Sequence, residues 1–194
     1  MKRSIAQTIN TGTAAVSSKD WKADSYTRQT ALTPSIFTQY VKSRKEHQTI
    51  SDLSSIDKDG IYVWQTGIPF PEITAVPSQF NDFNVLLIVA DTVSINMVNF
   101  NPTKSIAIIA TTINFSSTTT ESKGIFIAQT INTGSSSTQG LKITGNLVAF
   151  SSFVNGREWP DNSQPSVFIV FDQEQYINLL PYLSTASYEW RQTQ

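Results

Sequence analysis

The chain is 194 residues long, enough for one hydrophobic core or for one core with a small appended segment. Its 14 basic and 15 acidic residues give a formal net charge of -1, so no global field attracts nucleic acid or an anionic membrane surface. Because cysteine is absent, disulfides, thiolate metal sites and thiol nucleophiles are excluded.

The surface is expected to be neutral and polar, because charged residues make up only 15% of the chain while Ser, Thr, Asn and Gln are abundant. This composition is typical of secreted and cell-surface β proteins. The chain has no apolar run of about 18 residues, and the segment after Met1 lacks the apolar centre of a signal peptide. We therefore expect no membrane insertion, and a cell-surface protein that either had its export signal in a longer precursor or is the C-terminal piece of a larger protein.

Residues 1–32 are predicted to form an N-terminal arm. The octapeptide Ile5–Gly12 is identical to Ile127–Gly134, whereas residues 17–28 are polar and read as irregular. One hypothesis is that Ile5, Gln7, Thr8 and Ile9 add a strand to the end of the β structure, in the same or a neighbouring molecule. The alternative is that this strand simply pairs within its own chain.

The main domain, residues 33–194, is predicted to open with a helix. Thr33 is a candidate N-cap, Pro34 suits the first helical position, and the helix should end near His47. Its apolar face comprises Ile36, Phe37, Tyr40 and Val41. The basic cluster in its last turns interacts favourably with the negative end of the helix dipole. We interpret this cluster as a solvated face and not as a nucleic-acid patch. The only histidine, His47, has no partner cluster that would indicate catalysis or metal binding.

Five segments of the main domain then share one alternation of apolar and polar residues. They begin at Ile61, Leu86, Ile106, Ile125 and Leu141, so the spacing shortens steadily along the chain. β-branched residues that alternate with polar ones, between breaks of Gly, Ser, Thr or Asn, indicate short strands. Variable spacings of roughly 20 residues suit the coils of a solenoid. The sequence therefore predicts an all-β fold, a single-stranded parallel β-helix or solenoid.

Stacking these segments places Thr92, Thr112, Thr130 and Asn146 in one column, where like side chains can hydrogen-bond along the stack. We interpret the column as structural, because threonine is common in strands. A regularly spaced, flat threonine face that binds ice or a glycan is the alternative.

The loop within Ser151–Pro165 is the strongest candidate site for chemistry. Its residues Arg157, Glu158, Trp159 and Asp161, with Asp172 nearby, are candidates for binding or cleaving a carbohydrate. Charged residues elsewhere in the coils are scattered, so we predict that the protein is not an enzyme. The Asp57–Gly60 segment reads as a turn, because it lacks the further acids of a calcium loop. We expect no metal and no cofactor.

The chain is predicted to end with a buried strand over Ser166–Phe171, followed by a short helix that opens with a capping box at Asp172 and is limited by Pro181. An apolar helix here would cap the last coil of the solenoid. A final strand around Tyr188 would then fold back.

Several phrases of this region resemble the C-terminal β-helix module of large, uncharacterised envelope proteins from candidate-phyla bacteria. The phrases are Asp59–Val63, Gly124–Ala128, Gly140–Leu147, Pro165–Asp172 and Leu179–Leu183. The resemblance covers roughly residues 57–194. It implies a right-handed parallel β-helix at the cell surface, similar in principle to the polymer-forming bactofilins, and no particular activity.

Together these features predict a non-enzymatic structural or adhesive module whose partners are further copies of itself or neighbouring surface proteins. Carbohydrate binding or cleavage by the 155–161 loop is the alternative.

Overall fold

A computed structural model describes residues 2–6, 21–25, 34–158 and 165–183. The chain divides into two units, Met1–Leu32 and Thr33–Gln194. In the first unit, strand β1 (Lys2–Ala6) pairs in parallel with strand β2 (Trp21–Ser25). The sequence predicted an irregular segment over residues 17–28, so β2 is a strand that the composition did not reveal.

The described residues of the second unit form three helices and a nine-stranded sheet. The helices are α1 (Pro34–Arg44), α2 (Gln79–Asp82) and α3 (Gln173–Leu183). The strands are β3 (Gln48–Ile50), β4 (Gly60–Trp64), β5 (Val85–Ile88), β6 (Thr92–Ile95), β7 (Asn99–Phe100), β8 (Ile106–Phe115), β9 (Glu121–Ser136), β10 (Leu141–Arg157) and β11 (Val167–Val170). A 3-10 turn covers Leu53–Ser55.

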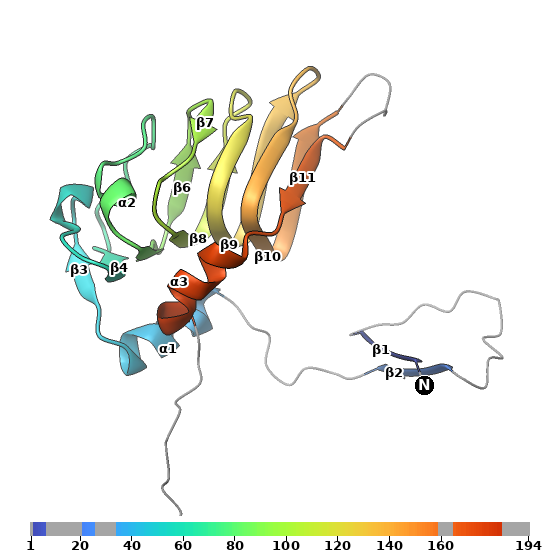
Figure 1. The fold of residues 1–194 in the computed structure, drawn as a ribbon, viewed down its shortest axis with the longest axis horizontal. Helices are drawn as coiled ribbons and strands as arrows, with labels where there is room; N and C mark the ends of the chain where they lie inside the picture. The colour runs from blue at the N-terminus through green and yellow to red at the C-terminus, as the bar shows by residue number, and fades with distance from the viewer. Residues whose placement is uncertain (1, 7–20, 26–33, 159–164, 184–194) are drawn as a thin grey trace, which may run out of the picture. The chain divides into compact units, whose positions relative to one another are not determined.

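The strands form a β-solenoid of about 5 turns, which confirms the predicted fold class (Figure 1). Every pairing between the named strands is parallel. The pairings build three stacks. The first stack contains β3, β4, β5, the first half of β8 and the middle of β9 and β10. The second contains β6 and the later parts of β8, β9 and β10, and the third contains β7, the starts of β9 and β10, and β11.

The register of the coils differs from the sequence alignment at two points. In the first stack, Leu86 pairs with Ala107, which pairs with Ile125, which pairs with Asn146. The third coil therefore starts one residue later than predicted, and the fifth starts at Asn146 instead of Leu141. The fifth coil was misplaced because the long strand β10 begins in the third stack. Its alternation of apolar and polar residues there resembles the alternation in the first stack.

A pair of glycines marks the bend between these stacks in β9 and β10. Gly124 and Gly145 are register partners and both have positive φ, at 148° and 133°. A Cβ added to Gly145 would lie 2.1 Å from the Gly124 carbonyl oxygen. Close backbone approach at a bend requires glycine here, so this pair helps to set the register of the last coil.

The repeated phrase of the sequence stacks on itself in register. Ile109–Asn114 in β8 reads Ile-Ala-Thr-Thr-Ile-Asn, and Ile127–Asn132 in β9 reads Ile-Ala-Gln-Thr-Ile-Asn. Each pairing that joins these segments matches like with like, as in Ile113 with Ile131. The repeat is therefore one structural unit, which carries the chain from the first stack through the bend into the second.

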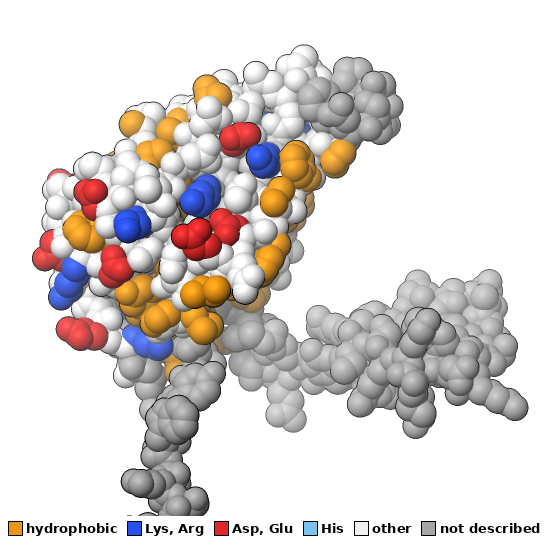
Figure 2. Space-filling model, viewed as in Figure 1, with side chains coloured by type: hydrophobic (Ala, Val, Ile, Leu, Met, Phe, Trp, Pro, Cys, Tyr) orange, Lys and Arg blue, Asp and Glu red, His pale blue; other side chains and the backbone are white. Residues whose placement is uncertain are grey.

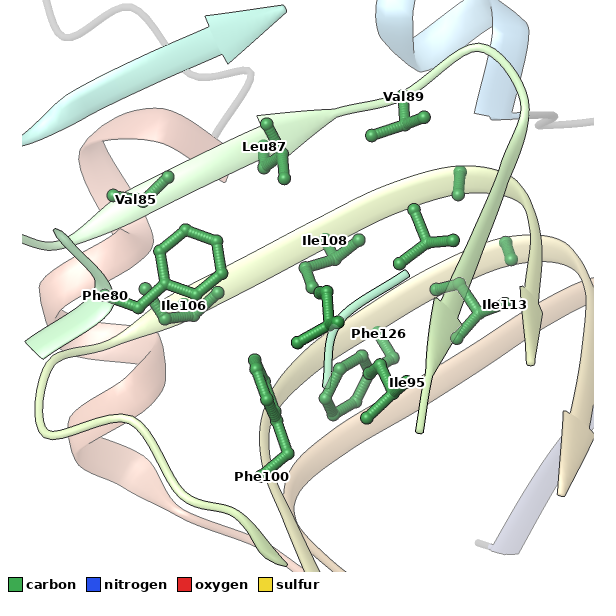
Figure 3. Packing of buried hydrophobic residues seen from close by; sticks show 14 of the residues in the cluster. Phe80, Val85, Leu87, Val89, Ile95, Phe100, Ile106, Ile108, Ile113 and Phe126 are labelled. Carbon is green, nitrogen blue, oxygen red and sulfur yellow. The ribbon is translucent and has the colours of Figure 1, made fainter. Parts of the chain in front are cut away.

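The hydrophobic core lies inside the coils, where inward side chains from successive strands contact one another (Figure 3). Phe126 is central to this core. Its ring lies 5.2 Å from the ring of Phe115 and 6.3 Å from that of Phe100, measured between centroids. Ile108 and Ile113 of β8 are also fully buried. Such a continuous core stabilises strands that would not be stable alone.

A second apolar cluster lies on the outer face of the first stack. Outward residues such as Leu86 and Ile88 of β5 pack with Val41 of α1 and Leu179 of α3. Strands in this stack are therefore buried on both faces, which explains why Val85–Ile88 is a continuous apolar run.

The C-terminal helix predicted from the sequence is present, but it lies against this outer face. Gln175 of α3 is buried, and its Oε1 accepts a hydrogen bond from the backbone N–H of Ile106 at 3.2 Å. Lys45, just after α1, donates to the carbonyl oxygen of Pro181 at 2.6 Å, which ties α1 to α3. The helix therefore covers the outer side of the first stack from β5 to β10, where the Asn146 amide donates a hydrogen bond to the Tyr176 hydroxyl.

Candidate functional site

Arg157 is placed differently from the loop position that the sequence suggested. Its side chain is only 1% exposed. The guanidinium donates from Nε to the Thr133 carbonyl at 2.6 Å, and from Nη2 to the Ser116 carbonyl at 2.7 Å. Its Nη1 donates to the carbonyls of Gln139 and Gly140 at 3.2 and 3.1 Å. Arg157 therefore links successive coils, and four of its five N–H donors are bonded to backbone carbonyls.

Burial lowers the pKa of the Arg157 guanidinium from its ordinary value. The group nevertheless stays protonated, because the guanidinium pKa in water is far above the physiological range. Four backbone carbonyls, rather than a carboxylate, satisfy this buried cation. This arrangement suits a residue that closes turns, and it removes the basic partner on which the carbohydrate hypothesis depended.

The other described candidate residues for carbohydrate binding, Glu158 and Asp172, make separate structural contacts. Glu158 is exposed, and its backbone N–H donates to the Ser136 carbonyl at 2.9 Å. The Asp172 carboxylate accepts a hydrogen bond from the Glu174 N–H at 3.0 Å and so caps the start of α3. Trp159 and Asp161 lie outside the described residues. Within the described part of the chain, the loop therefore offers no group of converging acids.

The predicted polar column is present with one change. Thr92, Thr112 and Thr130 are register partners, as predicted. In the last coil Ser152 pairs with Thr130, so the prediction that Asn146 occupies this column was wrong. Asn146 belongs to the first stack, because β10 reaches that stack later than the sequence alignment assumed.

A neighbouring column carries a hydrogen bond along the stack. The Asn132 amide donates to the Asn114 side-chain oxygen at 2.6 Å, and these residues are register partners. Thr133, one residue further along β9, also donates to Asn155 at 3.0 Å. These contacts between coils are structural, in line with the interpretation of the threonine column.

Two of the surface hollows lie beside α1 or contain the only histidine. One, of about 580 Å³, lies between α1 and the sheet and is lined by residues that include Thr38, Lys42 and Gln129. The other, of about 270 Å³, contains Glu46, His47 and Asp59. Asp59 there accepts two hydrogen bonds from Asn84, both at 2.9 Å, and His47 Nδ1 is 3.1 Å from the Lys45 carbonyl. These contacts give both residues a structural role.

Among the described residues, no group of three or more His, Asp or Glu side chains could hold a metal ion. None of the described helices is both long enough and apolar enough to cross a membrane.

The end of the solenoid formed by β10 is the most distinctive surface. Val93, Ile113 and Ile131 form one inward column, and each is fully buried. The next residue of that column, Phe153, is 45% exposed. The core that runs through the coils therefore reaches the surface at Phe153.

The backbone of β10 is also unpaired on that side. Strand β11 pairs only with Leu141–Thr144 of β10. Among the described strands, none pairs with the outer edge of β10 from Gly145 to Arg157, which we call the open end. In the described part of the chain, this edge therefore combines unpaired strand backbone with exposed apolar side chains such as Phe153, as the docking of a further coil requires.

Comparison with models of known protein families, with curated proteins and with solved structures finds no match for this chain. Its resemblance to envelope proteins therefore stays a prediction.

Exposed apolar side chains continue from the open end onto its neighbours. The sequence predicted that Ser166–Phe171 is a buried strand, but Phe168, Ile169 and Val170 of β11 are 45, 46 and 40% exposed. The prediction failed because β11 pairs on one edge only. Figure 2 shows apolar side chains along β11 and on the outer side of α3, where Ile177 and Leu180 are exposed.

Proposed function

We propose that the protein is a non-enzymatic structural module that associates with further copies of itself through the open end. The observation that carries this proposal is the exposure of Phe153 at the end of a column whose other members are fully buried. Soluble proteins usually cover both the edge strands and the core at the end of a solenoid. A solenoid that leaves both accessible is suited to assembly.

The energetics favour association at this surface. Burying an aromatic side chain such as Phe153 completely contributes about 1.5–3 kcal/mol relative to full exposure. Phe150 and Val154, also in β10, are likewise exposed and would be covered with it. A strand that pairs with the open end would in addition satisfy the row of N–H and C=O groups along β10.

Composition supports a structural role at the cell surface. Charged residues make up 15% of the chain, and the described hollows do not combine several free acids. Hydrolysis of a glycan would need two carboxyl groups on either side of the bond that is cleaved. A neutral, polar exterior is typical of secreted and surface β proteins, and we place the module there.

The proposal is tested by light scattering after size-exclusion chromatography over a range of concentrations. We expect the average mass to rise with concentration. Replacing Phe153 with Asp should weaken association about tenfold or more, because it places a charge in the contact. The control is Val98→Asp, which makes the same kind of change at an exposed site outside β10 and should leave association unchanged.

Far-ultraviolet circular dichroism establishes that both variants keep their β structure. A mass equal to that of one chain at every concentration would refute the proposal. So would equal association of the Phe153→Asp variant and the wild-type protein.

A further inference from the structure

We infer that the segment that completes the open end is the N-terminal octapeptide Ile5–Gly12 of a second copy. This inference rests on the proposed self-association and names its partner segment. The octapeptide would pair in parallel with β10 and provide the parts of the next coil that the chain itself does not build.

The chain leaves the solenoid at a point that defines the missing part. β10 passes through the third, first and second stacks in turn, and β11 covers only its third-stack portion. After β11 the chain enters α3, and no later strand is present among the described residues. Within the described part of the chain, the next coil therefore has its third-stack strand but lacks the strands of the first and second stacks.

The octapeptide is the sequence that forms those two strands in the coil of β9. Ile127–Gly134 has the same residues, and there Ala128 belongs to the first stack and Ile131 to the second. In β9 this sequence already pairs with the β10 segment that forms the open end, with Ala128 opposite Ala149 and Ile131 opposite Phe153. The side chains of the octapeptide therefore match the columns that the open end leaves incomplete.

The register that follows from this identity places the octapeptide beyond the residues of β10 that pair with β11. Because Ile127 pairs with Val148, Ile5 of the second copy would lie opposite Val148 on the other edge of β10. The last residue of β10 that pairs with β11 is Thr144. The added strand would thus begin beyond the point where β11 ends, and Ile9 would cover Phe153.

The two described strands of the arm pair in the same way as strands of consecutive coils. Lys2 pairs in parallel with Trp21, so the chain returns beside itself after about the length of one coil. Consecutive coils of the solenoid return over similar stretches of sequence, as from Ala107 to Ile125 and from Gly124 to Gly145. A sheet of two parallel strands is marginal by itself. Docking on β10 would give it a neighbouring strand and a core.

We assign this role to a second copy of the chain. Donation between molecules satisfies both surfaces and repeats from copy to copy, because every copy carries one arm and one open end.

Disulfide trapping tests the partner and the register together. The chain has no cysteine, so two single variants, Thr8→Cys and Ser152→Cys, each introduce one thiol. These positions are opposite in the inferred register, because Thr130 pairs with Ser152. Neighbouring strands are about 4.8 Å apart, within the range that a disulfide spans.

The two full-length variants are mixed, oxidised gently and separated without reductant. The control mixture pairs Thr8→Cys with Ser117→Cys, because Ser117 is an exposed turn residue outside the open end. We expect the Thr8→Cys and Ser152→Cys mixture to give at least about tenfold more disulfide-linked heterodimer than this control. Light scattering should show that Ile9→Asp weakens association about 10- to 100-fold. Val16→Asp, the same kind of change outside the octapeptide, should leave association unchanged.

Each other outcome has a defined meaning. If Phe153→Asp weakens association but Ile9→Asp does not, and no heterodimer forms, the open end binds another surface; the inference is overturned and the proposed function stands. If a Thr8→Cys/Ser152→Cys double variant forms its disulfide within one chain while the mixed single variants stay unlinked, the arm covers its own solenoid, and the second copy is overturned as partner. A protein that stays monomeric at all concentrations overturns both proposals.

Discussion

Replacing Arg157 should destabilise the fold strongly although the residue lies far from any hollow with candidate chemistry. Its guanidinium donates four hydrogen bonds to the backbone carbonyls of Ser116, Thr133, Gln139 and Gly140. These carbonyls belong to the turns and strands of successive coils. Arg157→Met keeps much of the side-chain volume and removes all the donors, so the variant isolates the hydrogen bonds.

The magnitude follows from the number of bonds. A hydrogen bond to a charged group contributes about 1.5–3 kcal/mol, and the sum over four is reduced because water enters the vacated space. We expect the free energy of unfolding to fall by about 3–5 kcal/mol, a large part of the roughly 5–15 kcal/mol that is usual for a domain. For a chain of this length each kcal/mol lowers Tm by about 2–4 °C, so Tm should fall by roughly 6–20 °C.

Urea unfolding followed by circular dichroism measures this change, in the Phe153→Asp background so that association does not contribute. Arg157→Lys is the second variant. It keeps the charge, but a single ammonium group cannot reach the separate carbonyls that the planar fork spans, so its loss should approach that of Arg157→Met. The control, Lys104→Met, removes an exposed cation and should change stability by less than about 0.5 kcal/mol. If Arg157→Met is as stable as the Lys104→Met control, the structural role of the guanidinium is refuted.

Two further predictions concern the solenoid interior. Gly145→Ala should destabilise the protein by roughly 2–5 kcal/mol, because its Cβ would lie 2.1 Å from the Gly124 carbonyl oxygen at a φ of 133°. The control is Gly60→Ala, whose Cβ meets only a side-chain atom at 3.7 Å. Equal urea midpoints for the two variants would contradict the close approach at Gly145. Burial raises the pKa of the Tyr62 hydroxyl, which donates to the Lys58 carbonyl at 2.8 Å. The stability that the protonated Tyr62 hydroxyl contributes is therefore complete below the ordinary pKa of 10.0, and it is lost as the pH rises through the pKa of the folded state. Tyr62→Phe should therefore cost about 1 kcal/mol near pH 7 and reduce the loss of stability above pH 10, and an unchanged alkaline profile would argue against this role.

The fold class was predictable because the repeat is local in sequence. Segments such as Ile106–Phe115 alternate with period two and are bounded by turn residues, and such strands are stable only when stacked. The column of Thr92, Thr112 and Thr130 followed from the same alignment and is confirmed. The α1 helix also begins at Pro34, where the capping signals place it.

The placement of individual residues was less predictable, because it depends on which stack a strand enters. Leu141 begins an alternating apolar segment like the other four, yet it lies in the third stack. In the last coil, the residue that pairs with Ile125 is Asn146. Arg157 looked like a loop residue because the sequence does not show that the carbonyls of Ser116 and Thr133 lie beside it. A signal for the open end was present: no copy of the Ile-Ala-x-Thr-Ile-Asn phrase follows residue 165.

The sequence by itself determined the architecture, since hydrophobic periodicity and turn residues act over a few neighbours and favour stacked parallel strands whatever their surroundings. Only the tertiary structure decided which face α3 covers, where the core emerges at Phe153, and which carbonyls hold Arg157. These features join residues that are many positions apart, and their positions follow from backbone bends such as the one at Gly124 and Gly145. A bend that shifts the register by a few residues leaves the periodicity of the sequence unchanged but changes which residues meet.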